Sequence, residues 1–203
     1  MSTRADAPVN VEVLRREIAR TYTEVSTDPL KEFMFPTGRD WAQELGYPEP
    51  ELERVPDDTA ASFAGVANHW QHGSVAAGET VLDLGCGAGT DLLIAAQMTG
   101  PSGRAIGVDM TASMLERARA SSEAMGLTNL ELHESLIESL PLEAESVDVV
   151  ISNGVIDLIP DKEAVFAEID RVLRPGGRLQ IADVVIHKDV TEDARKRIDL
   201  WTG

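Results

Sequence analysis

A glycine-rich stretch is the first feature of this chain that could do chemistry. In "VLDLGCGAGTD", Gly85, Gly87 and Gly89 follow an apolar run typical of a strand and precede "TDLLIAAQMTG", a run typical of a helix. Glycines let the backbone approach a ligand closely, and a helix N-terminus offers unpaired N–H groups to an anion. The G-x-G-x-G spacing differs from the G-x-G-x-x-G of dinucleotide-binding proteins, so it disfavours a nicotinamide-dependent dehydrogenase.

Two acidic residues accompany this loop in the order that a nucleoside-binding site needs. Asp109 ends the next apolar run, 20 residues after Gly89, where an acid can accept hydrogen bonds from the cis-diol of a ribose. Asp83 lies inside the first predicted strand, where a carboxylate is costly unless it has a partner. We therefore expect Asp83 to bond loop N–H groups or an amine of a ligand. The alternative is a tight strand-to-helix turn with a surface aspartate.

The elements that must position these residues alternate along the chain from residue 79 onward. We expect strands over 80–85, 104–110, 129–133, 146–152 and 178–187. The expected helices cover 90–100, 111–126, 161–177 and 191–201, with Thr111 and Asp161 as N-caps, and with Gly126 and the sequence Pro-Gly-Gly as stops. This alternation predicts an α/β fold: a doubly wound, mostly parallel Rossmann-like sheet with helices on both faces. Ligands in such sheets bind at the carboxyl ends of the strands, near the switch point.

The fifth expected strand is apolar on both faces, and no further strand follows it. An uncovered apolar edge favours association with another chain. We expect a second copy, a partner or another segment to cover it; otherwise the chain is a fragment that lacks the last strands.

The part before residue 75 has a different composition. Residues 1–10 are expected to form a loose tail, residues 11–74 a helical arm or lid, and residues 75–203 the ligand-binding domain. Apolar residues at helical spacing predict an amphipathic helix over 11–26. Residues 28–58 are rich in proline and are expected to be a loop with one short helix near 38–45, followed by another short helix within 57–70.

Aromatic residues gather in the arm, although the chain as a whole is only 4% aromatic. Phe33, Phe35, Trp41 and Tyr47 could wall a small-molecule pocket, or they could anchor the arm to the core. Two histidines, His69 and His72, could share a helix face, but two ligands do not make a metal site, and we predict none.

Composition excludes several classes of function. The net charge of −17 repels phosphate backbones and anionic membranes, so we expect no nucleic acid and no membrane as partner. A single cysteine, Cys86, excludes an internal disulfide framework and a cysteine-built metal site. No apolar run approaches the ~20 residues of a membrane span, and "MSTRADAPVN" lacks an apolar signal core, so the expected location is cytoplasmic.

The motifs "VLDLGCGAGTD", "AIGVDMT" and "VLRPGG" resemble those of class I S-adenosylmethionine-dependent methyltransferases. This resemblance implies S-adenosyl-L-methionine as cofactor. It implies that the loop from Gly85 through Cys86 and Gly87 to Gly89 binds the methionine part, mainly through its backbone. It also implies that Asp109 holds the ribose hydroxyls and that Met110 packs on the adenine.

The stretches "SFAGVANHW", "GVDMTASML", "IESLP" and "ISNGVIDLIPDKEAVFAEIDRVLRPGG" are similar to the arsenite methyltransferase family. That similarity implies that Ile137 and Glu138 lie at the adenine and that Tyr22 closes the site as a lid. From the residues alone, Glu138 could instead be an exposed loop carboxylate. Tyr22 could simply continue the apolar stripe of Leu14 and Ile18.

The sequence Ser-Asn-Gly follows the fourth expected strand. Asn153 can bond the ligand by its side chain or backbone, with a plain turn as the alternative. The resemblance places a metalloid-binding cysteine where this chain has Gly154, and this counts against arsenic as the methyl acceptor.

Together these features predict an S-adenosylmethionine-dependent methyltransferase that acts on a small-molecule acceptor. We assign no catalytic residue and no metal. Only Asp183 and His187, on the fifth expected strand, are candidates for a general base. The alternative is a non-catalytic cofactor-binding subunit or a truncated fragment of a methyltransferase.

Overall fold

The computed structural model describes residues 9–28, 31, 33–195 and 197–201 of the chain. The tail expected at residues 1–10 therefore lies almost entirely outside the described residues. None of the described helices combines the length and the apolar character that a membrane span needs.

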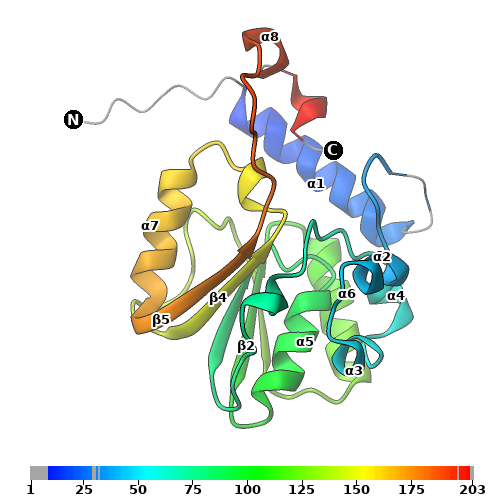
Figure 1. The fold of residues 1–203 in the computed structure, drawn as a ribbon, viewed down its shortest axis with the longest axis vertical. Helices are drawn as coiled ribbons and strands as arrows, with labels where there is room; N and C mark the ends of the chain where they lie inside the picture. The colour runs from blue at the N-terminus through cyan, green and yellow to red at the C-terminus, as the bar shows by residue number, and fades with distance from the viewer. Residues whose placement is uncertain (1–8, 29–30, 32, 196, 202–203) are drawn as a thin grey trace.

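Five parallel strands form one sheet in the order β3-β2-β1-β4-β5 (Figure 1). They are β1 (Thr80–Leu84), β2 (Arg104–Asp109), β3 (Leu130–Glu134), β4 (Val147–Asn153) and β5 (Leu173–Ala182). The chain builds outward from β1 in one direction and then returns to its other side with β4, so the switch point lies between β1 and β4. The predicted doubly wound, parallel α/β sheet is confirmed.

The helices cover the two faces of this sheet. Along β1, Val81 packs with the buried residues of α5 (Thr90–Thr99), whereas Leu82 and Leu84 pack on the opposite face with α7 (Lys162–Val172). Because side chains alternate along a strand, apolar residues at successive positions bury both faces of β1 in this way. Helix α6 (Ala112–Ala124) packs beside α5.

The expected boundary between the last helix of the sheet and the fifth strand is wrong. Helix α7 ends at Val172, not at the Pro-Gly-Gly sequence, and β5 begins at Leu173. Pro175 lacks an N–H group and biases Arg174 towards extended backbone, so the helix cannot continue that far. The extra residues form a bulge, in which Asp148 alone lies opposite residues 174–177.

The C-terminal part of β5 also differs from the expectation. The strand ends at Ala182, and Val184, Val185 and Ile186 are exposed beyond it. No described strand pairs with the outer side of β5, so the predicted uncovered edge is present in the described part of the chain. The helix expected over 191–201 is divided into α8 (Glu192–Arg195) and the 3-10 helix η3 (Ile198–Leu200). Segments this short have little helical stability of their own.

The arm consists of one long helix and several short ones. Helix α1 (Val11–Thr27) begins after Asn10, whose side chain accepts a hydrogen bond from the Val13 N–H group. It is followed by α2 (Arg39–Glu44), α3 (Glu49–Leu52), α4 (Asp57–Ala61) and the 3-10 helix η1 (His69–His72). Helix α3 was not expected, because its prolines suggest a loop; prolines are tolerated in the first turn of a helix, where no N–H partner is lost.

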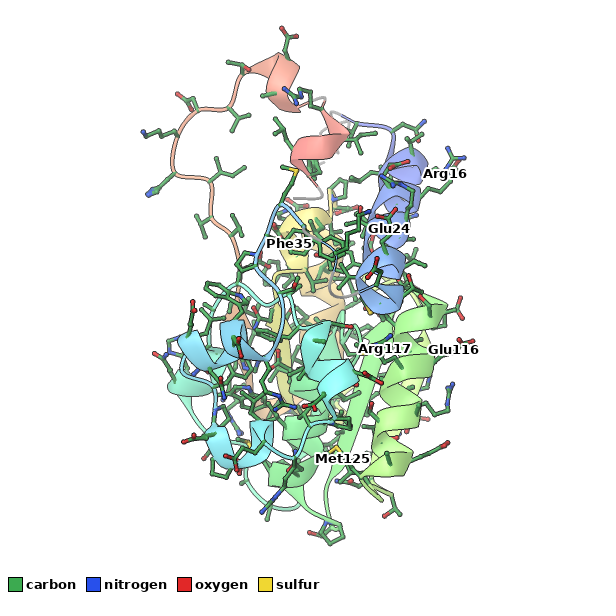
Figure 2. All side chains as sticks on the ribbon, turned by 90° about the vertical axis from the view of Figure 1, so that its right-hand side faces the viewer. Arg16, Glu24, Phe35, Glu116, Arg117 and Met125 are labelled. Atoms are coloured by element: carbon green, nitrogen blue, oxygen red, sulfur yellow. The ribbon has the colours of Figure 1, made fainter. Side chains whose placement is uncertain are left out.

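Helix α1 lies across the carboxyl ends of the strands (Figure 1), next to α6 (Figure 2). The aromatic residues of the arm do not form one wall. The rings of Phe33 and Phe35 stack at 5.7 Å, and the Trp41 indole donates a hydrogen bond to the Gly65 carbonyl over 2.7 Å. Tyr47 contacts Phe63 edge to face at 4.9 Å. These contacts support the anchoring interpretation.

Gly107 of β2 provides a test of how tightly the sheet packs beneath the glycine loop. A Cβ atom there would lie 2.6 Å from Leu92 Cδ2 and 2.8 Å from Cys86 Sγ. We predict that Gly107→Ala lowers the free energy of unfolding by about 1–3 kcal/mol through overpacking, measured by urea denaturation. The loss should shrink in a Cys86→Ala background, and an equal loss in both backgrounds would contradict the steric explanation.

Candidate functional site

A cleft of about 950 Å³, a volume that includes space open to solvent, lies at the carboxyl ends of the strands, where the order of the sheet reverses. Its lining comes from α1, the arm, the β1–α5 loop and the segments after β2, β3 and β4. All ten residues expected to bind a cofactor line it: Tyr22, Asp83, Gly85, Cys86, Gly87, Asp109, Met110, Ile137, Glu138 and Asn153. The structure thus brings the expected set together, and its binding role stays a prediction.

The β1–α5 loop needs glycine for two different reasons. Gly89 adopts a left-handed conformation, with a φ of 97°, immediately before α5. Gly85 combines a φ of 67° with a close approach, because a Cβ atom there would lie 2.5 Å from Val155 Cγ2 in the segment after β4. The loop therefore lies close against the segment after β4, and its glycines line the cleft.

Asp109 holds the loop and the start of α6 together. Its Oδ2 atom accepts a hydrogen bond from the Gly87 N–H group over 2.9 Å, and its Oδ1 atom accepts one from the Thr111 N–H group over 2.8 Å. Burial raises the pKa of Asp109, although these backbone hydrogen bonds oppose the rise. Each oxygen keeps a lone pair for a ligand. Thr111 occupies the expected N-cap position, but its side chain makes no capping hydrogen bond.

Asp83 is buried in β1 with only 3% of its surface exposed, and its Oδ2 atom has no hydrogen-bond partner. Burial, followed by the nearby carboxylates of Asp91 and Asp109, raises its pKa well above the usual value. The Leu92 N–H group of α5 opposes this rise, and the hydrogen bonds expected from the glycine loop to Asp83 are not made. A buried acceptor without a partner costs about 1–3 kcal/mol, which marks Oδ2 as a candidate contact for a donor on a ligand.

The single thiol is a packing group. Cys86 is buried against Gly107 of β2, and burial together with Asp109 and Asp83 raises the pKa of the thiol well above its usual value. Such a group is a poor source of thiolate. Within the described ranges of the chain, no group of three His, Cys, Asp or Glu side chains could hold a metal ion.

At the other end of the cleft, Ile137 and Glu138 lie in the segment after β3. The Glu138 side chain is only 12% exposed, so the exposed-loop alternative is wrong. Its Oε1 atom accepts a hydrogen bond from Arg15 of α1 over 2.9 Å, whereas its Oε2 atom is buried without a partner. Met110 packs nearby against Leu14 and Ile18 of α1.

Tyr22 combines the two roles that the sequence left open. It packs with the apolar stripe of α1 that contains Leu14 and Ile18, and it also lines the cleft. Its ring stacks on Phe35, with centroids 6.2 Å apart. Burial and three carboxylates, of which Asp157 has the largest effect, raise the pKa of Tyr22 far above its usual value. The phenol therefore stays protonated and can donate a hydrogen bond.

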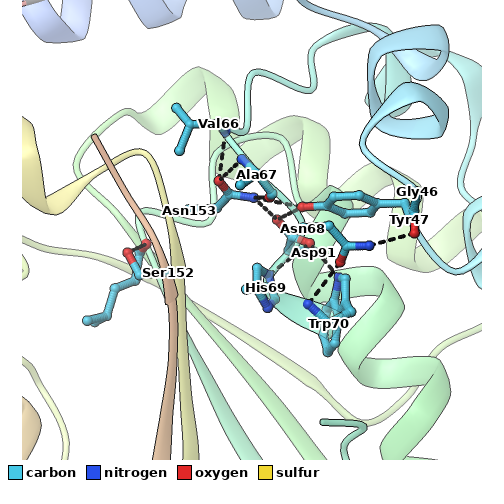
Figure 3. A network of polar contacts seen from close by, with 11 residues as sticks. Gly46, Tyr47, Val66, Ala67, Asn68, His69, Trp70, Asp91, Ser152 and Asn153 are labelled. Carbon is cyan, nitrogen blue, oxygen red and sulfur yellow. Dashed lines mark hydrogen bonds and ion pairs between the residues drawn. The ribbon is translucent and has the colours of Figure 1, made fainter. Parts of the chain in front are cut away.

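The side-chain amide of Asn153 connects β4 to the arm. Its Oδ1 atom accepts a hydrogen bond from the Val66 N–H group over 2.8 Å (Figure 3). Its Nδ2 atom donates to the Tyr47 hydroxyl over 2.7 Å and to the Ala67 carbonyl over 2.9 Å. Asn153 also lines the cleft, and its expected contact with a ligand, by side chain or backbone, stays a prediction.

Asp91, in the first turn of α5, lies in the candidate site although it was not among the residues expected there. It accepts hydrogen bonds from the Tyr47 hydroxyl over 3.0 Å and from the Trp70 indole over 2.9 Å, and His69 Nε2 lies 3.2 Å away (Figure 3). Asp91 also lines the cleft. An acid in the first turn of a helix that follows a glycine loop was the available signal.

Neither candidate for a general base lies in the cleft. His187 is exposed, beyond the end of β5, and Asp183 accepts hydrogen bonds from the Ile156 and Asp157 N–H groups. The described lining instead contains an apolar wall that was not expected, formed by residues 63–65 of the arm together with Val155 and Leu158. We assign no base.

Comparisons with known proteins agree with this geometry. A family model described as "Methyltransferase domain" matches residues 76–202. An arsenite methyltransferase of Halobacterium salinarum is 43% identical over 162 residues, which cover 80% of this chain and 41% of that protein. A demethylmenaquinone methyltransferase of Lactococcus lactis is 39% identical over 102 residues, which cover 50% of this chain and 40% of that protein.

Among solved structures, an arsenic(III) S-adenosylmethionine methyltransferase from Chlamydomonas reinhardtii matches with a TM-score of 0.64 and 35% identity. The match covers 71% of this chain and 51% of that one. The chain thus spans only about half of that protein and 41% of the archaeal relative.

The pH dependence of stability tests the burial of Asp83. Because its pKa is raised in the folded state, the folded chain holds the proton more tightly than the unfolded chain does, and the stability contributed by Asp83 falls as the pH rises from about 4. Asp83→Asn lacks this titration. We predict that urea denaturation without ligand shows the variant gaining stability relative to the wild type between about pH 4.5 and pH 7.5. Parallel stability curves would contradict a raised pKa.

The connection at Asn153 gives a second prediction. Asn153→Ala leaves the Val66 N–H group without its acceptor and removes the donor to the Tyr47 hydroxyl, which keeps only Asp91, so we expect a loss of about 1–3 kcal/mol in the free energy of unfolding. Asn153→Asp keeps the shape but places a carboxylate where Nδ2 now lies 3.5 Å from Asp91 Oδ2, and it should destabilise as well. A neutral result in chemical denaturation for both variants would show that the network is not needed.

Proposed function

The chain belongs to the methyltransferase-domain family, and on that premise we propose that its cleft binds S-adenosyl-L-methionine for methyl transfer to a small-molecule acceptor. The observation that carries this proposal is the row of acidic side chains along one cleft. Asp83, Asp109 and Glu138 follow or lie in β1, β2 and β3, and all three line the cleft. Their order suits an amine, a ribose diol and an adenine amino group.

The side chains present fit this cofactor. The unpartnered Asp83 Oδ2 atom would accept from the ammonium group of the methionine part, and the free lone pairs of Asp109 would accept from the ribose hydroxyls. The unpartnered Glu138 Oε2 atom would accept from the adenine amino group. Met110 and Ile137 supply apolar surface for the adenine ring. Each orphaned acceptor thereby gains a donor.

When bound, the cofactor would supply a methyl group on a sulfonium, whose carbon a nucleophile can attack in line with the thioether as leaving group. The contribution of this chain is to hold the acceptor close to that group and to exclude water. The apolar wall of residues 63–65, Val155 and Leu158 is suited to both tasks, and α1 covers it through Ile18 and Tyr22. The described lining contains no histidine, which fits an acceptor that needs little help in losing a proton.

Gly154, at the end of β4, limits the range of methyl acceptors that this cleft could hold. Gly154 has a φ of 66°, and a Cβ atom there would lie 2.9 Å from Val66 Cγ1. The only thiol, Cys86, is buried on the sheet. We therefore propose a small soft nucleophile that is not held through thiolates of the described residues.

A partner or second copy on the outer edge of β5 is a separate proposal, which rests on the exposed Val184, Val185 and Ile186.

Titration calorimetry with S-adenosylmethionine and S-adenosylhomocysteine tests the shared premise. We predict that the wild type binds both and that Asp109→Asn weakens binding about tenfold or more, since the variant presents one acceptor oxygen where the wild type has two. Asp170→Asn, at an exposed position of α7, is the matched control and should leave binding unchanged. The proposal would be overturned if NAD raised the thermal unfolding temperature of the folded wild type while neither S-adenosylmethionine nor S-adenosylhomocysteine did.

An assay of radiolabelled methyl transfer distinguishes a catalytic methyltransferase from a non-catalytic cofactor-binding subunit. The acceptors to compare are small thiols, arsenite in the presence of thiol, and a hydroquinone. Transfer to at least one of them is the expected result. Cofactor binding without any transfer would support a non-catalytic cofactor-binding subunit, which no present observation favours.

A further inference from the structure

We propose that Arg15 of α1 is a positioning residue for adenine recognition, which fixes the Glu138 carboxylate so that one oxygen faces the nucleobase. This inference rests on the proposed function, because it concerns how the same cleft would read its cofactor. It assigns to the N-terminal arm a part in ligand selectivity in addition to covering the cleft.

The first observation is the face of α1 on which Arg15 lies. Arg15, Ile18 and Tyr22 are spaced at i, i+3 and i+7, which places them on one face of the helix. Ile18 and Tyr22 line the cleft, and Arg15, one turn before Ile18, reaches Glu138 on the segment after β3. The same helix face therefore covers the cleft and also contacts Glu138 at the end where we propose that adenine binds.

The second observation is that the other end of α1 is held separately. Ser26 Oγ lies 3.1 Å from Ser113 Oγ, and the guanidinium of Arg117, which is labelled on α6 in Figure 2, donates to the Ser26 carbonyl. Helix α1 is thus fixed on α6 at its C-terminal end and on Glu138 near its N-terminal end, and the cleft lies between these points. Loss of the Arg15 contact would leave the N-terminal half of the helix held by the apolar contacts of Leu14 and Ile18, without a polar contact to Glu138.

The third observation is how the carboxylate is used. Glu138 Oε1 accepts from Arg15 Nη2 over 2.9 Å, and Oε2 is buried with no partner. The Arg15 side chain is 36% exposed and that of Glu138 only 12%, so solvent screens this pair less than a fully exposed pair. Arg15 therefore determines which oxygen remains for a ligand and in which direction it points.

These contacts make a specific statement about selectivity. The Oε2 atom can accept a hydrogen bond but cannot donate one, so it favours the amino group of adenine over the carbonyl oxygen of hypoxanthine. Without Arg15, the carboxylate can turn towards water and satisfy itself there. Adenine binding and the observed position of α1 should also stabilise each other, because both depend on one orientation of Glu138.

Titration calorimetry with two product analogues tests the role of Arg15. S-adenosylhomocysteine carries the amino group, and S-inosylhomocysteine has a carbonyl oxygen in its place. We predict that the wild type prefers the adenine compound, and that Arg15→Ala weakens its binding about tenfold while changing binding of the inosine compound less than about threefold. Arg16→Ala, at the neighbouring exposed position, removes the same charge and should change neither affinity (Figure 2).

Glu138→Gln supplies an independent check, because its amide can accept from Arg15 with its oxygen and offer an N–H donor to the ligand. We expect this variant to shift the preference towards the inosine compound. Thermal unfolding of each variant confirms that it is folded. An equal loss for both compounds in Arg15→Ala, no loss, or no preference in the wild type would overturn the role of Arg15. Absence of binding of either compound by the wild type would instead overturn the proposed function.

Discussion

Burial of acidic groups without a neighbouring positive charge is the constraint on which this cleft depends. Asp83 and Asp109 lie deep at the ends of the central strands, and burial raises the pKa of both. The protein offsets part of the cost with backbone N–H groups from Gly87, Thr111 and Leu92. The glycine loop and the first turns of α5 and α6 have the positions they do because those N–H groups must point inward. The cost of burying Asp83 Oδ2 without a hydrogen-bond donor is not offset within the protein, and a donor on a ligand would offset it.

The arm is joined to this site by buried polar contacts rather than by chain connection alone. Asp91 of α5 binds Tyr47 and Trp70 of the arm, and Asn153 of β4 binds Val66 and Tyr47. Apolar residues of the arm also share a buried cluster with α5. The division into an arm over 11–74 and a domain over 75–203 stays a prediction, but the arm supplies part of the wall of the cleft.

Much of the fold and of the site could be predicted from the sequence, because both follow local patterns. These signals are local: about thirty residues, the length of one strand-helix-strand unit, contain the alternation of strand and helix, the glycine loop and Asp109. The end of α7 at Val172 differs from the predicted boundary because Pro175 biases the preceding residue towards extended backbone.

Contacts between distant segments could not be predicted in the same way. The residues Arg15 and Glu138 are separated by 123 positions, and Asn153 and Tyr47 by 106. An asparagine amide after a strand is equally suited to a ligand and to another backbone segment, and only the folded arm decides between them.

Gly154 has a consequence for how the acceptor range of this scaffold can change. A side chain at that position meets Val66, and it also inherits a left-handed backbone that costs an L-residue about 1–2 kcal/mol. Acquiring a thiol at the end of β4 therefore requires Val66 to move or become smaller, and the backbone strain to be absorbed. Positions 66 and 154 are coupled in this way, so that together they influence which evolutionary or engineered routes to a metalloid-binding site are open.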